Sequence, residues 1–427
     1  MSVETDLSAA PAASTDRRPM RLLGRNRDYT LLWSGQLISS TGSQISDIAI
    51  PLLVYSLTQS AAQTGIAGAL RGIPYVLLML PAGALVDRWN RRRVMLICDT
   101  GRTLALASIP LAALFGRLSL PQIYLVALIE GTLHVFFSLA QTASLPRIVP
   151  SPQLPAATAQ NELLESTAVL AGPPVAGALF GISRALPFLA DAISYAVSVA
   201  TVFLVRTPLA PERTAEPISL RAIAADVREG IVWLWRAPVI RFLAVLTSGL
   251  MISSYGYSLV VIVLAKQQHA SNFTIGLIFG AGGAGAIIGA LLAAPLQARL
   301  GFARLIRVAT WGWALTWLGF AVAPNPPLLA VATALSYVVV PIYMATQFGY
   351  RLQAIPDALQ ARVNSVFRLI AFGVQPLGFA LTGLLIQLTG PIAAVLLLFI
   401  PQIALALAVS LNPRLRRGGA IERDEAA

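Results

Sequence analysis

The sequence has little charge, little histidine and almost no cysteine. Asp, Glu, Lys and Arg make up only 12% of its 427 residues, whereas a soluble protein carries roughly 25%. The single cysteine, Cys98, cannot form an intrachain disulfide, and the His count of 2 is too low for a histidine-based metal site. We also find no phosphate-binding loop and no nucleophile–base pair. The sequence therefore predicts no enzyme, no ATP-driven pump, no metal site and no cofactor.

Hydrophobic residues take the place of charge along the whole chain. They make up 56% of it, and the mean hydropathy is +0.72, which indicates that lipid is the solvent. The net charge is +12. A chain this apolar is not expected to bind nucleic acid, so we interpret the basic excess as a marker of membrane topology and as a contact surface for anionic lipids.

Twelve apolar runs are long enough to cross a bilayer as helices. The expected spans are residues 29–56, 61–86, 94–116, 120–145, 156–182, 186–205, 239–265, 272–297, 303–324, 327–350, 361–389 and 392–411. We predict an all-α membrane protein with twelve transmembrane helices in two pseudo-symmetric six-helix bundles. The expected segments are a disordered cytoplasmic N-terminus (1–28), an N-terminal six-helix bundle (29–205), a cytoplasmic linker with an amphipathic helix (206–238), a C-terminal six-helix bundle (239–411) and a cytoplasmic tail (412–427).

Basic residues separate the two sides of the membrane. Most arginines fall in the termini, the linker and alternate loops, whereas the opposite loops carry only Arg117, Arg184 and Lys266. The positive-inside rule then places both termini in the cytoplasm, which agrees with an even number of spans. We expect a multi-pass protein of the bacterial inner membrane.

A charged turn joins the second and third predicted spans, and a basic copy of it follows the eighth span. The turn is Gly83-Ala-Leu-Val-Asp87-Arg88-Trp-Asn-Arg91-Arg92-Arg93, and the copy, Gln297-Ala-Arg-Leu-Gly301, lacks the acid. A repeat of two six-span halves is typical of secondary transporters. With this turn the chain resembles the major facilitator superfamily. Together with Leu32-Trp33 and Ala69 to Pro74, it is most similar to the bacterial drug and siderophore exporter branch, which includes macrolide-efflux and enterobactin-exporter-like proteins.

The resemblance implies a function as well as a fold. It implies a monomeric secondary active transporter that exports a drug-like or secondary-metabolite molecule by proton antiport with alternating access. Its expected partners are an amphipathic small molecule, protons and membrane lipids. The alternatives are an importer or symporter of another solute, or a lipid-transporting or non-transporting protein on the same fold. Two departures stand out: Asn90 replaces the usual glycine of the charged turn, where it could adopt the left-handed conformation, and Glu130 stands near the place of an arginine in span four.

Charged residues inside spans are costly and mark candidate functional sites. Asp47 in span one and Arg71 in span two reach similar depths, so we expect a buried ion pair that is either coupled to transport or static. Glu130 falls near the middle of span four as a lone carboxylate, a candidate for proton exchange or for binding a cationic substrate. Asp191, in the outer part of span six, is a candidate for gating or lining an outer vestibule.

A second group of charges is expected at the cytoplasmic end. Glu165, Arg102 and Arg368 have similar depths in the inner half and could form a gate of ion pairs, or lie at the headgroups instead. Asp87 is expected to cap the helix that begins near Arg362 while the inner side is closed. Arg88, Arg91 and Arg92 would add latch pairs or lipid contacts to this cap, beyond their role as topology markers.

Span five contains the predicted hinge. Proline removes a backbone donor and glycines allow close helix approach, so Gly172, Pro173 and Gly177 predict a bent, tightly packed helix. This pattern also resembles the antiporter signature of the same superfamily.

Overall fold

The structure is a computed structural model that describes residues 23–210 and 220–416. Its helices are α1 (Arg27–Thr58), α2 (Ala61–Val86), α3 (Arg91–Leu114), α4 (Leu120–Ile148), α5 (Leu154–Ile182), α6 (Leu186–Leu204), α7 (Leu220–Arg236), α8 (Pro238–Gln267), α9 (Asn272–Val322), α10 (Pro326–Ala354), α11 (Gln360–Phe372), α12 (Gln375–Thr389), α13 (Pro391–Leu411) and α14 (Pro413–Arg416), with short 3₁₀ turns before α5 and α11. The described residues contain no strand, which confirms the all-α prediction.

Eleven helical segments of the described chain are long and apolar enough to cross a membrane. One of them is a double span: α9 has 51 residues and turns sharply at Gly301, where φ is 70°. Glycine adopts this left-handed conformation without the steric cost that other residues meet. The two arms of α9 match the eighth and ninth predicted spans, so the number of crossings agrees with the sequence.

Polar side chains fix where several helices begin. Asn26, Ser60, Asn90, Ser271 and Asn325 each accept a hydrogen bond from a backbone N–H in the first turn of the helix that follows. Such caps satisfy donors that have no partner within the helix. Asn90 therefore replaces the family glycine as the cap of α3 and not in the left-handed conformation, since its φ is −64°.

The N-terminal prediction is partly wrong. Residues 1–22 lie outside the described part of the chain, but Arg27 and Asp28, placed in the disordered segment by the sequence, belong to α1. The carboxylate of Asp28 accepts hydrogen bonds from the backbone N–H groups of Arg206 at 3.1 Å and Thr207 at 2.7 Å. This contact ties the start of α1 to the end of α6.

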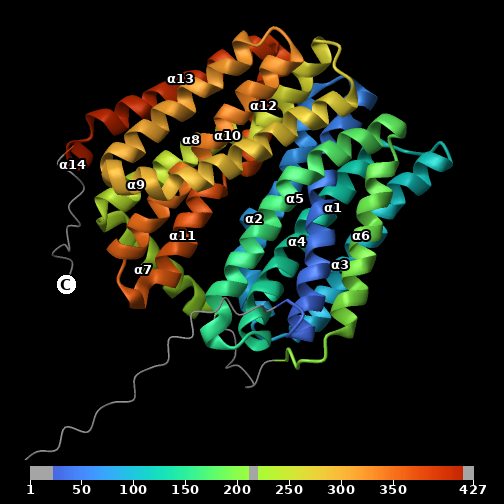
Figure 1. The fold of residues 1–427 in the computed structure, drawn as a ribbon, viewed down its shortest axis with the longest axis horizontal. Helices are drawn as coiled ribbons and strands as arrows, with labels where there is room; N and C mark the ends of the chain where they lie inside the picture. The colour runs from blue at the N-terminus through green and yellow to red at the C-terminus, as the bar shows by residue number, and fades with distance from the viewer. Residues whose placement is uncertain (1–22, 211–219, 417–427) are drawn as a thin grey trace, which may run out of the picture.

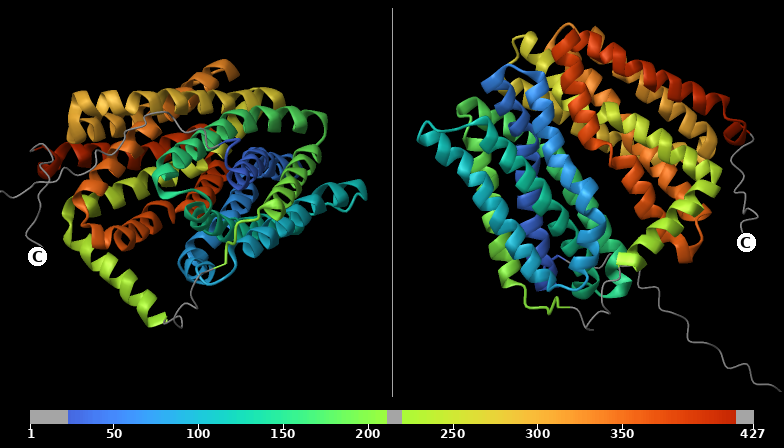
Figure 2. Two further views of the ribbon diagram at one scale, coloured as in Figure 1. Left: turned by 60° about the horizontal axis from the view of Figure 1, so that its bottom comes forward. Right: turned by 180° about the vertical axis from the view of Figure 1, so that it is seen from behind.

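The spans form two bundles, α1–α6 and α8–α13 (Figures 1 and 2). We call the side that carries α7, the start of α1 and the end of α13 the linker side, and the opposite side the far side. The bundles touch towards the far side, through α2 with α12 and α5 with α9. Towards the linker side, the ribbons of α11 and of α2 diverge (Figure 2, right).

Small residues make the far-side contact possible. A Cβ built on Gly65 would lie 2.6 Å from the carbonyl oxygen of Phe379 and 3.0 Å from the Cα of Gly383. No larger residue fits at this distance, so glycine permits the backbones of α2 and α12 to meet. Nearer the loop, the Ser60 hydroxyl donates to Gln387 Oε1 at 3.0 Å.

The linker helix and the eleventh span connect to each other. The amphipathic helix predicted in the linker is α7, which packs against α11 and carries an ion pair between Glu229 Oε2 and Arg362 Nη1 at 2.6 Å. Its Ile231, Val232 and Trp235 side chains are exposed. The eleventh span is interrupted between α11 and α12, whereas α5, where the hinge was predicted, is continuous from Leu154 to Ile182.

Candidate functional site

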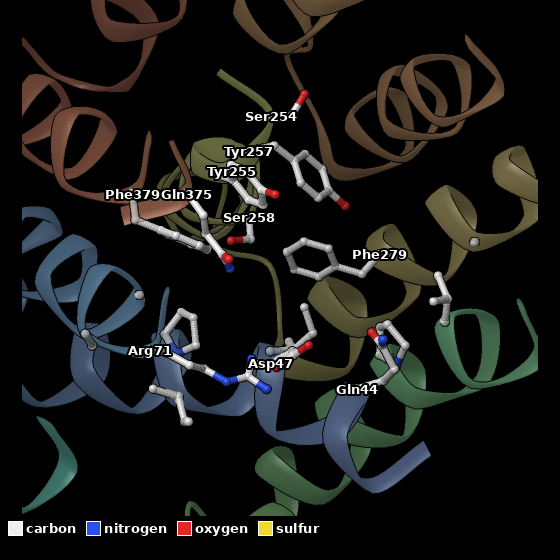
Figure 3. Close-up of a pocket in the computed structure, with 18 of the residues that line it drawn as sticks. Gln44, Asp47, Arg71, Ser254, Tyr255, Tyr257, Ser258, Phe279, Gln375 and Phe379 are labelled. Atoms are coloured by element: carbon white, nitrogen blue, oxygen red, sulfur yellow. Dashed lines mark ion pairs between the residues drawn. The ribbon is translucent and has the colours of Figure 1, made fainter. Parts of the chain in front are cut away.

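A cavity of about 270 Å³ lies between the two bundles (Figure 3). Its first wall comes from α1, α2 and α5 and includes the charged residues Asp47 and Arg71. Its second wall comes from α8, α9, α10 and α12 and contains no charged residue. The side chains that distinguish the second wall are Tyr255, Tyr257, Phe279, Tyr337 and Phe379, with Ser254, Ser258 and Gln375 beside them. The cavity is therefore charged on one side, and aromatic with hydroxyl groups on the other.

Acidic residues are also distributed unequally between the two bundles. Residues 238–411 contain a single acidic residue, Asp357, and it lies in the 3₁₀ turn before α11. Every intramembrane carboxylate of the chain therefore belongs to α1–α6. The second bundle can supply a shaped wall for a ligand, but it has no carboxylate at membrane depth to bind a proton.

Asp47 and Arg71 form the ion pair predicted from their depths. Asp47 is on α1 and Arg71 on α2, and both side chains remain partly exposed, at 33% and 23%. Both also line the cavity. This is the only part of the buried charge network described below that a ligand in the cavity would meet directly.

Glu130 is not the lone carboxylate that the sequence suggested. Its side chain is 0% exposed and accepts from Arg71 Nε at 2.5 Å and from Arg102 Nη2 at 2.6 Å. The hydroxyl of Tyr195 also donates to it, at 3.2 Å. The sequence did not predict its neutralisation by two guanidinium groups from neighbouring helices.

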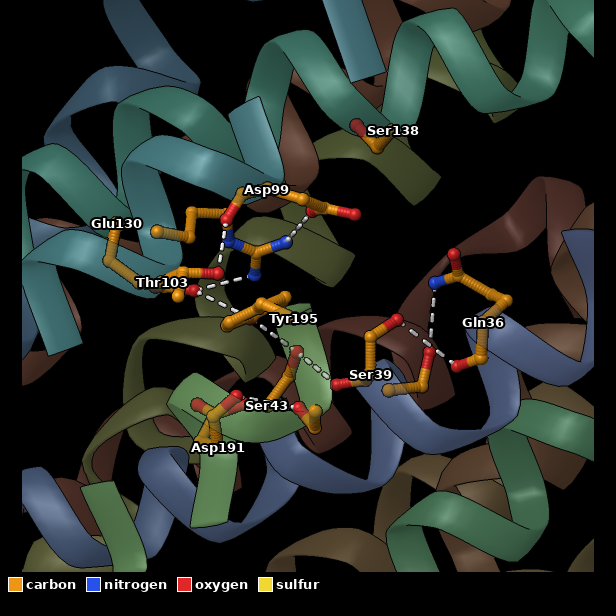
Figure 4. A network of polar contacts seen from close by, with 12 residues as sticks. Gln36, Ser39, Ser43, Asp99, Thr103, Glu130, Ser138, Asp191 and Tyr195 are labelled. Carbon is orange, nitrogen blue, oxygen red and sulfur yellow. Dashed lines mark hydrogen bonds and ion pairs between the residues drawn. The ribbon is translucent and has the colours of Figure 1, made fainter. Parts of the chain in front are cut away.

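Arg102 is buried in this network, of which Asp99, Glu130 and Tyr195 are labelled in Figure 4, and does not lie in the predicted cytoplasmic gate. In addition to pairing with Glu130, the Arg102 guanidinium lies over the ring of Tyr195, 3.9 Å from the ring centroid. The distance from Arg102 Nη1 to Asp99 Oδ1 is 3.7 Å. The Tyr195 hydroxyl in turn is 2.7 Å from the Ser43 hydroxyl on α1. Four helices, α1, α3, α4 and α6, are thus joined through one arginine and its neighbours.

Asp99 was missed at the level of sequence. The available signal was its spacing, since Asp99 and Arg102 are three residues apart inside the third predicted span and lie on one helix face. The structure adds a chain of alternating charges that runs from the cavity into the first bundle. In order, its members are Asp47, Arg71, Glu130, Arg102 and Asp99.

Asp191 does not line an outer vestibule. Its side chain is completely buried between α6 and α1, where the hydroxyl of Ser46 donates to it and that of Ser194 donates at 3.0 Å. A vestibule residue needs contact with water, so the structure replaces that prediction with a buried acid held by hydroxyl groups.

The other predicted gate residues are separated in this structure. Glu165 is exposed on α5 and accepts a hydrogen bond from Ser40 at 3.1 Å. Arg368 is exposed on α11 of the other bundle. No ion pair joins these two within the described residues, so a gate between them is not formed here.

Several contacts of the charged turn lie within the first bundle. Arg91 Nη1 donates to the carbonyl of Ala143 at 3.0 Å, and Arg92 donates to the last carbonyls of α6 and lies over the ring of Phe203. Cations stabilise such helix ends. Asp87 is exposed, and in the described part of the chain its carboxylate forms no hydrogen bond or ion pair. Arg362, the expected neighbour of Asp87, pairs with α7 instead.

The predicted hinge residues hold α5 against both bundles. A Cβ on Gly172 would meet Gln44 of α1, and one on Gly177 would meet Asn272 of α9. Pro173 also lines the cavity. These positions give α5 a bridging place between the bundles, and their role as a hinge stays a prediction.

Comparison with known proteins places the chain in a family. A family model described as "Transmembrane secretion effector" matches residues 23–426. The multidrug efflux pump Tap of Mycolicibacterium fortuitum is 27% identical over 90% of this chain and 96% of its own length. The enterobactin exporter EntS of Citrobacter koseri is 25% identical over 88% of this chain and 89% of its own length.

Solved structures share the fold at low identity. The nucleoside transporter NupG superimposes with a TM-score of 0.73 at 15% identity, covering 90% of this chain and 98% of its own. A bacterial homologue of the iron transporter ferroportin, in its inward-facing state, gives 0.65 at 18% identity and covers 89% and 98%. These proteins are transporters and not enzymes. Because the family model matches almost the whole length of the chain, the chain belongs to the transmembrane secretion effector family of the major facilitator superfamily.

Proposed function

We propose that this protein is a secondary active exporter of small amphipathic molecules, driven by proton antiport across the bacterial cytoplasmic membrane. The observation that carries the proposal is the cavity between the bundles, with the partly exposed Asp47–Arg71 ion pair on one wall and aromatic side chains on the other. The multidrug and siderophore exporters to which the chain is similar support the direction of transport.

The arrangement of the bundles supports alternating access. They are in contact towards the far side and diverge on the linker side. With the arginine-rich linker side in the cytoplasm, as the positive-inside rule indicates, the central site is reached from inside the cell. Rocking of one bundle against the other would then expose the same site to the outside.

Among the carboxylates of the network, Asp47 is the one best placed to bind a cation from the cavity. Glu130 is held by two guanidinium groups and shielded from water, so its protonation would break two buried ion pairs. Asp47 pairs with one arginine and is partly exposed, so it can exchange that partner for a cation at lower cost. We therefore assign cavity-facing exchange to Asp47, and the fixing of both arginines to Glu130.

The chemistry of the walls favours an organic cation with an aromatic body. Asp47 offers negative charge to a ligand, and the tyrosine and phenylalanine rings offer faces that attract cations. Ethidium, a permanently charged aromatic cation, is therefore a suitable probe. Its binding should raise the unfolding temperature of the purified protein.

Transport is tested in proteoliposomes with an acidic interior and ethidium outside. We expect gradient-driven accumulation for the wild type and none for Asp47→Asn. Asp357→Asn is the matched control, because it removes an exposed carboxylate far from the cavity and should transport normally. Accumulation that requires an alkaline interior would indicate symport, and gradient-independent movement of labelled lipid would indicate a lipid transporter; either result contradicts the proposal.

A further inference from the structure

The buried carboxylate of Asp99 has poorer partners than any other member of the charge network. It is 0% exposed, its nearest cation is Arg102 Nη1 at 3.7 Å, and neither of its oxygens meets a hydrogen-bond partner in the described chain. The hydroxyl of Ser198 on α6 is a neighbouring polar group. A buried polar group in this position requires an explanation, because an uncompensated charge there is very unfavourable.

The charge count of the network supplies that explanation. Its three carboxylates, Asp47, Glu130 and Asp99, share two guanidinium groups, Arg71 and Arg102. If all five were ionised, the network would hold one negative charge without a partner. Arg71 pairs with Asp47 and Glu130, and Arg102 lies much closer to Glu130 than to Asp99. The acid left without a close cation is therefore Asp99, at the end of the network remote from the cavity.

We propose that Asp99 carries the transported proton in this state and loses it when a cationic substrate binds at Asp47. The proposal rests on the antiport function proposed above, and it adds a proton-carrying residue that does not touch the substrate. It assigns the two ends of the network to different tasks, with substrate at the cavity end and the proton at the Asp99 end.

Coupling follows from the sharing of arginines. A cation bound to Asp47 leaves Arg71 to pair with Glu130 alone. The charge of Glu130 is then neutralised by Arg71, which weakens the hold of Glu130 on Arg102. Arg102 can therefore move the short distance to Asp99. An approaching guanidinium favours the ionised carboxylate, so the O–H bond of Asp99 breaks and the proton passes to water. One positive charge enters at Asp47 and one leaves from Asp99, so the total charge of the site is unchanged.

The position of Asp99 suits release towards the linker side. It lies eight residues after the start of α3 at Arg91, about 12 Å along the helix axis. Asp191 is not part of this exchange, since its partners are Ser46 and Ser194 and it forms no ion pair among the described residues. The titratable and charged groups that face Asp99 and Arg102 are Arg71 from α2, Cys98 from α3, Glu130 and His134 from α4, and Asp191 and Tyr195 from α6.

The experiment measures protons released when ethidium binds to the purified, full-length protein in weakly buffered detergent solution. We expect the wild type to release one proton for each ethidium bound, and less as the starting pH is raised and Asp99 is already ionised. Asp99→Asn should bind ethidium with unchanged affinity and release none. In proteoliposomes, the same variant should exchange ethidium for ethidium but should not respond to a pH gradient.

Two further variants keep the test decisive. Asp99→Glu restores a carboxyl group and should restore proton release, which a merely structural need for aspartate would not predict. Asp191→Asn should release protons as the wild type does, because its acid lies outside the exchange. If Asp99→Asn misfolds, infrared difference spectra of the wild type still test whether Asp99 loses its proton. Ethidium binding should remove a carboxylic acid C=O band, and this band should shift in frequency in Asp99→Glu.

The outcomes separate the two proposals. Gradient-driven transport by the wild type with undiminished proton release from Asp99→Asn overturns the role of Asp99 and leaves antiport intact. A wild type that binds ethidium without releasing a proton and ignores a pH gradient overturns antiport itself, and this inference with it.

Discussion

Replacing Glu130 by glutamine should damage the stability of the protein before it affects coupling. The side chain accepts from Arg71 at 2.5 Å and from Arg102 at 2.6 Å and is fully buried. Removing one partner of a buried ion pair costs about 3–5 kcal/mol, because the remaining charge is left uncompensated. Arg71 keeps Asp47, so most of this cost falls on Arg102, which regains a close partner only by moving to Asp99, 3.7 Å away, and displacing its proton. We expect Glu130→Gln to lower the free energy of unfolding by about 3–5 kcal/mol.

The measurement is equilibrium unfolding of purified protein in mixed micelles, followed by the loss of helical circular dichroism. Glu165→Gln is the matched control, since it neutralises an exposed carboxylate on the neighbouring helix and should change stability by about 0.5 kcal/mol or less. The double variant Glu130→Gln, Arg102→Gln removes one charge of each sign and leaves Arg71 with Asp47. Because the two residues are in contact, their effects should not add, and the double variant should be more stable than Glu130→Gln alone.

The reasoning fails if Glu130→Gln unfolds within about 1 kcal/mol of the wild type. It also fails if the double variant is less stable than the wild type by the sum of the two single effects. Such results would mean that the buried arginines find other partners, or that water reaches them.

Two more changes probe the conformational cycle. Gly65→Leu places a side chain where a Cβ would already lie 2.6 Å from the Phe379 carbonyl oxygen, so it should hold the far side apart. Cysteines placed on the far side in a Cys98→Ser background should then react faster with hydrophilic thiol reagents than in the protein with Gly65. Unchanged rates would contradict the packing argument. Asp87→Asn should leave stability unchanged, because the carboxylate is exposed here, but should reduce crosslinking of cysteine pairs across the linker-side mouth; equal crosslinking would count against a latch.

The structure assigns different partners to several charged residues than their positions along the predicted spans suggested. Asp47 and Arg71 could be paired from depth alone, because they lie on consecutive spans and reach the same level. Arg102 and Glu130 could not, since the predicted depth of Arg102 pointed to the inner mouth. Long arginine side chains extend several ångströms from their helix, and the direction of that reach depends on the rotation of α3 against α4 and α6, which no local pattern specifies.

Hydrophobicity and helix caps are local properties of the sequence, and they determined where the helices lie along the chain. The lipid environment, the spans, the amphipathic helix α7 and the family follow from residues close together in the chain, because each helix satisfies its own backbone hydrogen bonds in the membrane. Tertiary structure alone decided which carboxylate each guanidinium neutralises, that Asp191 is sealed from water, and that Asp99 is left without a close cation. Those are contacts between different helices over a few ångströms, and only the packed bundle fixes them.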